Sequence, residues 1–391
     1  MKTLYLHIGL PKTGTTSIQK FCMDNKNKLN EMGYVYPDFD HHYAHVSTRR
    51  NGHFLVGVCK GKDGNRDYEK EEKLRQRGLK MLAETFQTHS KVILSDENLW
   101  HGSIKRKQDA DVWKILTEHS REYGYQIKII IYLRRQDDLA LSWINQQVKA
   151  GWSGFKELTW EKFLENPHYI RLNYYKHLEE IASIFGDEAI CVRVFEPGQF
   201  VGGSIYADFI DAIGLEWNED YVIEEERANT GLSCNGQEIK RIMNDLPDHD
   251  DETFRFVRDT MRASAGVGVK SDRYEYLSAD ERRAFLKKYE EGNRKIAEKY
   301  LGREDGKLFR EVESKKEKWM PDNPEMMEDV VRFLGEMILV QQKEINKLES
   351  KLSKVEKQLN DVKQKNEKKE EKNDNKENAG RRNKYGLFNR T

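Results

Sequence analysis

The stretch Leu4–Gln19, LYLHIGLPKTGTTSIQ, decides the fold of this chain. Leu4, Leu6 and Ile8 predict an apolar strand, which runs into a Gly/Pro turn and then into small hydroxyl residues that open a helix. Such a turn surrounds an anion with backbone N–H donors at the helix N-terminus, where the helix dipole also favours negative charge. We therefore expect a ligand that carries phosphate.

The position of the lysine in this loop separates two kinds of phosphate ligand. The nucleoside triphosphatase pattern G-x-x-x-x-G-K-[ST] places a lysine directly after the second glycine, where it reaches the β- and γ-phosphates. Here Gly9 and Gly14 keep the glycine spacing, but Thr15 occupies the lysine position. The lysine of the loop, Lys12, comes before Gly14 instead. The pattern therefore differs from an ordinary ATP or GTP loop.

The segment Pro11–Ser17, PKTGTTS, closely resembles the 5′-phosphosulfate loop of sulfotransferases that use 3′-phosphoadenosine 5′-phosphosulfate (PAPS), in particular their bacterial and carbohydrate-type branch. The resemblance implies an α/β fold like that of P-loop proteins, with a parallel central sheet flanked by helices. It also implies PAPS as co-substrate, adenosine 3′,5′-bisphosphate (PAP) as product, and no metal. The residues implied to bind the 5′-phosphosulfate are Lys12, Thr13, Gly14, Thr15, Thr16 and Ser17.

A second apolar run, IKIIIYL at 127–133, has the composition of a strand buried on both faces of a parallel sheet. It ends in Arg134 and Arg135, and a helix is expected to begin around Asp137 or Asp138, either of which could be its N-cap. An arginine at the strand end and a hydroxyl on the helix can converge on one phosphate.

The segment 132–143, YLRRQDDLALSW, resembles the 3′-phosphate motif of the same family. The resemblance implies that Arg134 and Ser142 hold the 3′-phosphate of PAPS. Arg135 is the alternative to Arg134. Gln136 and Leu139 depart from the residues that many members have at these positions, and both departures leave the implied phosphate ligands in place.

Sulfuryl transfer needs a base for the acceptor hydroxyl and a fixed cation for the departing 5′-phosphate. Lys12 is the candidate cation. The segment 91–100, KVILSDENLW, predicts a strand that ends in a polar cluster, and the carboxyl ends of strands in open α/β sheets face the ligand crevice. We predict Glu97 as the base, with Asp96 second and His53 as the histidine alternative.

Composition limits the other classes of function. Lys plus Arg and Asp plus Glu are both 67 in the 391 residues, so the net charge is zero and nothing suggests binding to nucleic acid. No apolar run approaches the length of a membrane span, and we expect no membrane anchor. The four cysteines are scattered without a C-x-x-C pair, which suits a reducing cytoplasm. We therefore predict a soluble cytoplasmic enzyme.

The sequence predicts four parts: a catalytic domain at 1–230, a helical extension or lid at 231–330, a coiled-coil helix at 331–362, and a disordered charged tail at 363–391. Apolar residues alternate at steps of three and four in the third part, which is typical of a coiled-coil seam. They are Ile345, Leu348, Leu352, Val355, Leu359 and Val362. The seam predicts a homo-oligomer, with a solvated amphipathic helix as the alternative.

The function that these patterns favour is transfer of the sulfuryl group from PAPS to a hydroxyl, or an amine, of a carbohydrate or related small molecule. A P-loop kinase or nucleotidase with a displaced lysine is one alternative, and a nucleotide-binding scaffold without catalysis is another. A cluster just past the second motif could line the acceptor site or simply form the faces of one helix. Its members are Trp143, Gln146, Gln147, Lys149, Trp152 and Phe155.

Overall fold

The computed structural model describes residues 1–100, 111–151, 155, 157–166, 170–223, 231–246, 251–263, 273–312, 314 and 316–386. The chain divides into two compact units. The first unit comprises Met1–Pro247 and Lys270–Asn323, and the second comprises Asp248–Val269 and Pro324–Thr391. Every residue expected to contact the phosphates belongs to the first unit.

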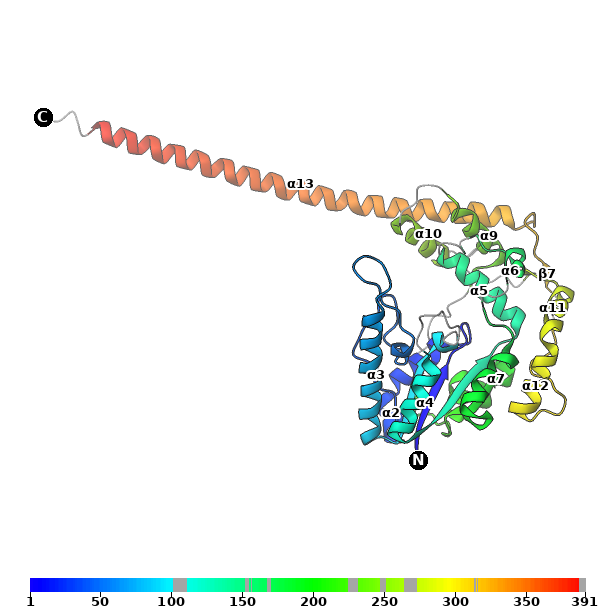
Figure 1. Ribbon diagram of the computed structural model, residues 1–391. Coiled ribbons are helices and arrows are strands. Elements are labelled where there is room, and N and C mark those ends of the chain that lie inside the picture. Colours follow the sequence, from blue (N-terminus) through cyan, green and yellow to red (C-terminus); the bar gives the residue numbers. More distant parts are fainter. Residues whose placement is uncertain are drawn as a thin grey trace. The chain divides into compact units, whose positions relative to one another are not determined.

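A parallel sheet forms the centre of the first unit (Figure 1). Within the described residues it has five strands in the order β2-β3-β1-β4-β5. Their bounds are β1 Lys2–Ile8, β2 Tyr34–Val35, β3 Lys91–Asp96, β4 Tyr125–Leu133 and β5 Ile190–Val194. All the strand pairs are parallel. The predicted α/β class with a parallel central sheet is therefore confirmed.

Helices cover both faces of this sheet because successive strand side chains point to opposite sides. One core combines apolar residues of β1, β3 and β4 with those of α3, α4, α5 and α7. The other combines Ile130 and Tyr132 of β4 with apolar residues of α1 and α8. The helix bounds are α1 Thr15–Asp24, α3 Tyr68–Thr88, α4 Val112–Tyr123, α5 Gln136–Ala150, α7 Tyr174–Phe185 and α8 Ile205–Ala212.

Shorter elements complete the first unit. They are α2 Lys26–Glu31, α6 Trp160–Glu165, α9 Cys234–Met243, α11 Ala279–Leu286, α12 Glu290–Leu301, and a parallel pair of β6 Tyr274–Glu275 and β7 Glu317–Lys318. The six 3₁₀ turns of the described residues are too short to form layers, and two of them, η1 His53–Leu55 and η2 Glu97–Trp100, carry candidate site residues. Our division of the chain at residues 230 and 330 stays a prediction.

The start of α5 differs from our prediction. The helix begins at Gln136 with Arg135 as its N-cap, and neither Asp137 nor Asp138 caps it. Asp137 is instead fully buried in the first turn, where it pairs with Arg135 and with Arg282. An aspartate side chain can complement the helix dipole from the first turn as well as from the cap, so sequence alone could not separate these roles.

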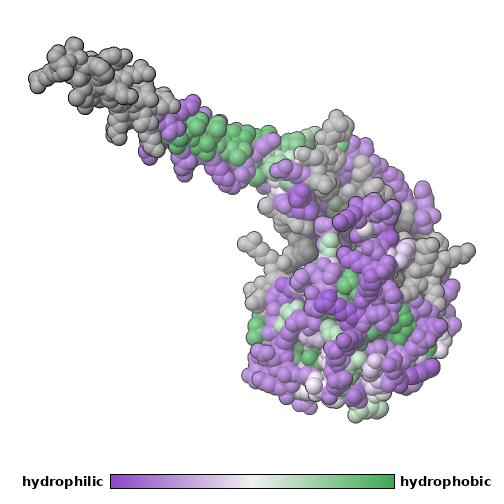
Figure 2. Space-filling model, turned by 60° about the vertical axis from the view of Figure 1, so that its left-hand side comes forward, coloured by the Kyte–Doolittle hydropathy of each residue, from purple (hydrophilic) through white to green (hydrophobic). Residues whose placement is uncertain are grey.

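The second unit contains α10 Asp251–Ala263 and the long helix α13 Met326–Gly386, which contact one another. The coiled-coil residues from Ile345 to Val362 are exposed along α13, and Figure 2 shows apolar side chains gathered on this helix. Val331, Leu334 and Ile338 are also exposed and continue the series toward the N-terminus with the same spacing.

The helix also extends further than we predicted. It continues through Gly386, whereas the sequence analysis expected disorder from residue 363. Lysine and glutamate, which dominate this stretch, are good helix formers, and no proline interrupts it. The absence of apolar residues, on which our expectation rested, removes a reason to pack but does not by itself oppose helix formation.

Candidate functional site

The turn between β1 and α1 has the geometry of an anion-binding loop. Gly14 is the N-cap of α1 in a left-handed conformation, with φ of 72°, and no side chain caps the helix. The first amides of a helix have no carbonyl within the helix to accept from them, so those of Thr15, Thr16 and Ser17 face the N-terminal end. Thr15 is buried, Ser17 is partly exposed, and Thr16 is exposed.

The loop packs so closely that only glycine fits at its start. A Cβ on Gly9 would lie 2.0 Å from Thr15 Cγ2 and 3.3 Å from the Cα of Glu97. The Gly9 amide donates to the carbonyl of Asp96 at 3.2 Å, and the hydroxyl of Thr13 donates to the carbonyl of Leu10 at 2.6 Å. These contacts hold the turn against the carboxyl end of β3.

Lys12 adopts a left-handed backbone conformation with φ of 67°, which is uncommon for a residue with a side chain. Such strained positions occur preferentially at functional sites. Burial lowers the pKa of Lys12, the charge of Arg134 lowers it further, and Glu97 opposes both effects. The Lys12 side chain is therefore a partly buried cation that interacts electrostatically with Arg134 and Glu97.

Arg134 joins the second sequence motif to this loop. Its Nη1 donates to the carbonyl of Lys12 at 3.0 Å, and its guanidinium carbon lies 5.8 Å from the ring centre of Phe195. The hydroxyl of Tyr174 donates to the backbone carbonyl of Arg134 at 2.8 Å, which fixes the strand end. Burial lowers the pKa of the Arg134 guanidinium, and the negative charge of Asp138 partly opposes this effect.

Lys12 and Arg134 are partly buried cations that form no ion pair with another described residue. Across the residues that the structure describes, neither side chain lies within ion-pair distance of a carboxylate. Arg135, by contrast, donates to Asp137 at 2.9 Å and pairs with Asp138 at 3.1 Å. A buried cation is costly unless an anion compensates it, so Lys12 and Arg134 form a site that attracts an anionic ligand.

Ser142 lies on the second turn of α5 and is partly exposed. Ser142 follows Arg134 by eight residues, which is about two turns of helix. The structure shows no contact between the two residues. Its part in holding a 3′-phosphate stays a prediction.

The carboxyl end of β3 carries an ion-paired cluster around Asp96. This side chain is fully buried, and Arg50 donates to both of its oxygens at 2.8 Å each. Nδ1 of His53 lies 2.9 Å from Oδ2, and it carries the proton because a carboxylate can only accept. Burial opposes the ionisation of Asp96, but the bonds from His53 and Arg50 outweigh it, so the pKa of this carboxyl lies below its ordinary value.

Glu97 occupies a different environment from its neighbour. Arg50 Nη1 donates to one of its oxygens at 3.1 Å, and about a third of the side chain is exposed, at 34%. Burial raises the pKa of Glu97, while Arg50 lowers it, Asp96 raises it, and Lys12 lowers it. The outcome is a carboxyl group with a raised pKa beside the loop, as expected for a general base.

The three residues we considered as the base are thus not equivalent. Asp96 has both oxygens engaged by Arg50, and it cannot take a proton without breaking a buried ion pair. His53 is buried and bonded to Asp96. Glu97 has an accessible edge and the electrostatic influence of Lys12. The geometry favours Glu97 and leaves His53 as the second candidate.

Arg50 is the member of this carboxylate cluster that sequence reasoning missed. It lies two residues before Gly52, in a loop that Asn51 anchors by accepting from the Ser95 amide at 2.8 Å. The only local signal was its place beside His53, a residue already considered for the cleft. Its partners Asp96 and Glu97 lie at the end of β3 and the start of η2, and Asp96 is 46 positions later in the chain.

Two recesses lie near these residues. The smaller, of about 10 Å³, is lined by Phe39, His41, His42, Tyr43, Val46, Ser47, Thr48, Arg50 and His53, and so borders the carboxylate cluster. The larger contains none of the residues proposed for the phosphates. Of the residues suggested for the acceptor, Trp143 packs edge-on against Phe155 with ring centres 5.4 Å apart, and Trp152 lies outside the described residues.

Neither a metal-binding group nor a membrane-spanning helix is found in the described parts of the chain. No cluster of three or more His, Cys, Asp or Glu side chains there could hold a metal ion. Likewise, none of the described helices combines the length and the apolar character that a membrane crossing requires.

Comparisons with known proteins give weak likenesses. No protein-family model matches the chain. An uncharacterized protein of Archaeoglobus fulgidus is 26% identical over 191 residues, which are 48% of this chain and 49% of that protein. The match thus spans about half the length of this relative.

Two solved structures are similar to part of the chain. A sulfotransferase from Alicyclobacillus acidocaldarius is 15% identical, with 58% of this chain and 87% of that chain covered and a TM-score of 0.31. Retinol dehydratase in complex with androsterone and the inactive cofactor PAP is 16% identical, with 56% and 62% covered and a TM-score of 0.28.

Proposed function

We propose that this protein is a PAPS-dependent sulfotransferase that transfers a sulfuryl group to a hydroxyl, or an amine, of a carbohydrate or related small molecule. The observation that carries the proposal is a pair of partly buried cations at the N-terminus of α1, Lys12 and Arg134, which have no carboxylate partner among the described residues. The lysine before Gly14 favours a phosphosulfate over a nucleoside triphosphate, because it does not occupy the position that reaches β- and γ-phosphates.

The residues present fit PAPS at both of its phosphate ends. The loop amides, Lys12 and the hydroxyls of Thr15, Thr16 and Ser17 would hold the 5′-phosphosulfate. Arg134, with Ser142, would hold the 3′-phosphate, and Arg135 is less suited because Asp137 and Asp138 already neutralise it. When bound, PAPS supplies the sulfuryl group, and no metal is part of the proposal.

The chain's own groups provide the charges that the transfer needs. Glu97 accepts the proton of the acceptor hydroxyl as that oxygen bonds to sulfur. The bond from sulfur to the 5′-phosphate oxygen breaks, and Lys12 stabilises the negative charge that develops on this oxygen. The products are PAP, a sulfate ester and a protonated Glu97, which returns its proton to water.

Arg50 has a positioning role in this scheme. It holds Asp96 through two bonds and Glu97 through one, so it fixes the orientation of the carboxylate that takes the proton. Its charge also favours the ionised form of Glu97.

The C-terminal helix suits self-association. Exposed apolar residues from Val331 to Val362 recur at steps of three and four and so form one apolar face, as in two-stranded coiled coils. Gln341 is a polar residue within this series. We propose that this face pairs with a second copy of the chain in a soluble cytoplasmic homo-oligomer.

The test of the proposed activity is transfer of radiolabelled sulfate from PAPS to a panel of glycans, lipids and small phenols. Labelled product should form with at least one acceptor. Lys12→Ala should slow turnover by about 100-fold or more, as expected when a preorganised charge-stabilising group is lost. Lys26→Ala, at a partly exposed position of α2, is the matched control and should keep full activity.

Two alternative functions give different results in the same assays. A kinase or nucleotidase would hydrolyse or transfer phosphate from ATP with Mg²⁺ and ignore PAPS. A scaffold without catalysis would bind PAP and transfer nothing to any acceptor. Full turnover by Lys12→Ala with a verified acceptor would remove the role proposed for this lysine.

A further inference from the structure

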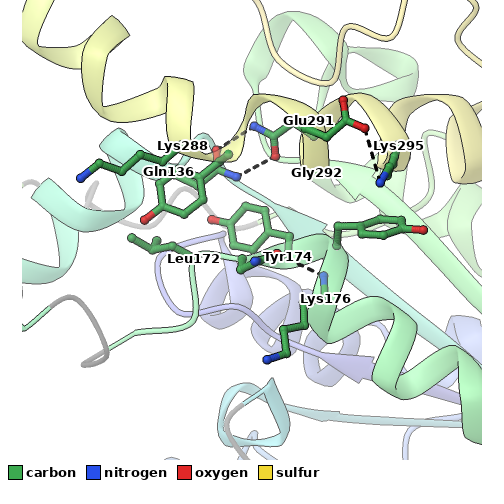
Figure 3. A pocket seen from close by; sticks show the side chains of 12 residues that line it. Gln136, Leu172, Tyr174, Lys176, Lys288, Glu291, Gly292 and Lys295 are labelled. Carbon is green, nitrogen blue, oxygen red and sulfur yellow. Dashed lines mark hydrogen bonds and ion pairs between the residues drawn. The ribbon is translucent and has the colours of Figure 1, made fainter.

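A pocket of about 270 Å³ lies in the first unit and is lined by none of the residues proposed for the donor. It forms between the beginnings of α5, α7 and α12 (Figure 3). Its lining residues are Gln136, Leu172, Asn173, Tyr174, Tyr175, Lys176, Lys288, Tyr289, Glu291, Gly292, Asn293 and Lys295. Nothing in the proposed transfer uses this pocket.

A pair of amides provides hydrogen-bonding groups of fixed orientation. Gln136 Nε2 donates to Asn293 Oδ1 at 2.7 Å, and Asn293 Nδ2 donates back to Gln136 Oε1 at 3.1 Å. Gln136 is fully buried, so this pair cannot rearrange freely. Asn293 is partly exposed, and the second hydrogen of its NH₂ is a donor suited to a hydroxyl of a ligand, while the buried Gln136 fixes its orientation.

The charge of the pocket is positive. Three lysines line it against one acid, Glu291, which already lies 3.4 Å from Lys295 and 2.9 Å from Arg294. In the described part of the chain, Lys176 and Lys288 have no carboxylate within ion-pair distance. Figure 3 shows the Lys288 and Lys176 side chains extending in different directions from the pocket, and the Lys288 ammonium lies 5.7 Å from the ring centre of Phe285. An anionic group at the mouth of the pocket would therefore meet one or the other of these cations.

Aromatic rings form the remaining walls. Tyr174, Tyr175 and Tyr289 line the pocket, and Lys295 lies 5.3 Å from the ring centre of Tyr175. Tyr174 has its hydroxyl bonded to the carbonyl of Arg134, so its ring is held in place. Rigid aromatic faces beside a few oriented polar groups are typical of sites for small ligands, and the volume is close to the lower end of such pockets.

We propose that this pocket binds an anionic sugar, meaning a hydroxyl-bearing ring of about one monosaccharide that carries a sulfate or carboxylate group. Tyr175 and Tyr289 would contact the ring, the second amide hydrogen of Asn293 would bond a hydroxyl, and Lys176 or Lys288 would pair with the anionic group. The inference goes beyond the proposed function and does not rest on it, because a sugar can bind here whether or not the protein transfers sulfate.

The test is calorimetric titration of the full-length protein with galactose 6-sulfate, glucuronate and unmodified galactose. At least one anionic sugar should bind at least about tenfold more tightly than galactose, on the scale of one charge-assisted contact. The double variant Lys176→Ala/Lys288→Ala should lose this preference. Lys80→Ala/Lys114→Ala, with exposed lysines on α3 and α4, should bind like the unmodified protein.

Three results would overturn the inference. They are no binding of either anionic sugar at millimolar concentration, unchanged binding by the Lys176/Lys288 double variant, and displacement of the sugar by PAP in competition. The last result would place the sugar in the donor site instead. The double variant should also bind PAP normally, which shows that it folds, and a failure of PAP to bind the unmodified protein would count only against the proposed function.

Discussion

Nη1 of Arg134 lies 3.0 Å from the carbonyl oxygen of Lys12, so the arginine that ends β4 is directly bonded to the loop that follows β1. The two strands are neighbours in the sheet, and their register pairs His7 with Ile130 close to these ends. Lys12 and Arg134 are 122 positions apart in the sequence, and this contact brings their two motifs into one cationic site.

The two arginines after β4 should differ in their effect on nucleotide affinity. Arg134→Ala should weaken PAP binding by about 1.5–3 kcal/mol, or roughly 10- to 150-fold, the usual range for a charge-assisted contact. Arg135→Ala should change the Kd little, because this side chain pairs with Asp137 and Asp138. Calorimetry with PAP measures both. A larger loss for Arg135→Ala would reverse the assignment.

The pH dependence of turnover should report Glu97. A general base acts only when ionised, and burial raises the pKa of Glu97 above its ordinary value. The value of kcat/KM should therefore fall, as the pH is lowered, at a higher pH than that of an ordinary glutamate, about 4.3. Glu97→Gln should lower kcat by about 100-fold or more and abolish this acid limb.

Arg50 should set the position of that acid limb. Its charge lowers the pKa of Glu97, so Arg50→Gln should move the limb to higher pH, whereas Arg77→Gln on the exposed face of α3 should not. Arg50→Lys keeps the charge and should give an intermediate shift if Arg50→Gln does not fold. If His53→Gln abolished the acid limb and Glu97→Gln did not, the base would be the histidine.

Asp96 should contribute to stability more than to chemistry. Asp96→Asn removes the fully buried carboxylate from the Arg50–Asp96 pair, and breaking a buried pair typically costs about 3–5 kcal/mol. Asp38→Asn, at an exposed pair with Lys26, should cost at most about 1 kcal/mol. Urea unfolding at neutral pH measures both free energies. Equal losses for the two variants would contradict a structural role for Asp96.

The sign of the pH effect on stability follows from the lowered pKa of Asp96. Its contribution is fully present above the unfolded-state value of about 3.9 and is lost as the pH falls through the lower folded-state value. His7 acts in the same direction, since burial lowers its pKa to about 3 and an unfolded chain takes up its proton first. The free energy of unfolding should therefore fall as the pH drops below about 6.5, and His7→Gln should reduce that slope.

Self-association should depend on the seam of α13. Leu348→Lys/Leu352→Lys places charges on the apolar face and should convert an oligomer to a monomer in light scattering. Ser350→Lys/Ser353→Lys adds the same charge at exposed positions off the seam and should leave the assembly intact. A monomer at all accessible concentrations in the unmodified protein would exclude the proposed oligomer.

Local patterns were sufficient for much of the fold and of the loop. The strands around Leu6, Ile93, Ile130 and Val192 were predictable because parallel strands buried on both faces are continuous apolar runs. The loop was predictable because Gly9 and Gly14 are required by a close approach and by a positive φ, respectively. Both constraints act within a few residues.

Contacts that depend on tertiary structure could not be predicted in the same way. Arg50 reaches Asp96 from a loop without regular spacing, and Arg282 reaches Asp137 from a helix 145 positions later. Arginine and aspartate in a polar stretch are normally solvent-exposed, so the sequence alone gives no reason to expect them in a buried ion pair. The same contact explains why Asp137 lies within α5 and does not cap it.

The most direct test of the account is paired calorimetry of the unmodified protein with PAP and with ATP plus Mg²⁺. Lys12 before Gly14 and Arg134 against the loop predict that PAP binds more tightly, and that Arg134→Ala weakens PAP far more than ATP. Saturable binding of ATP with Mg²⁺ and no response to PAP would contradict the account.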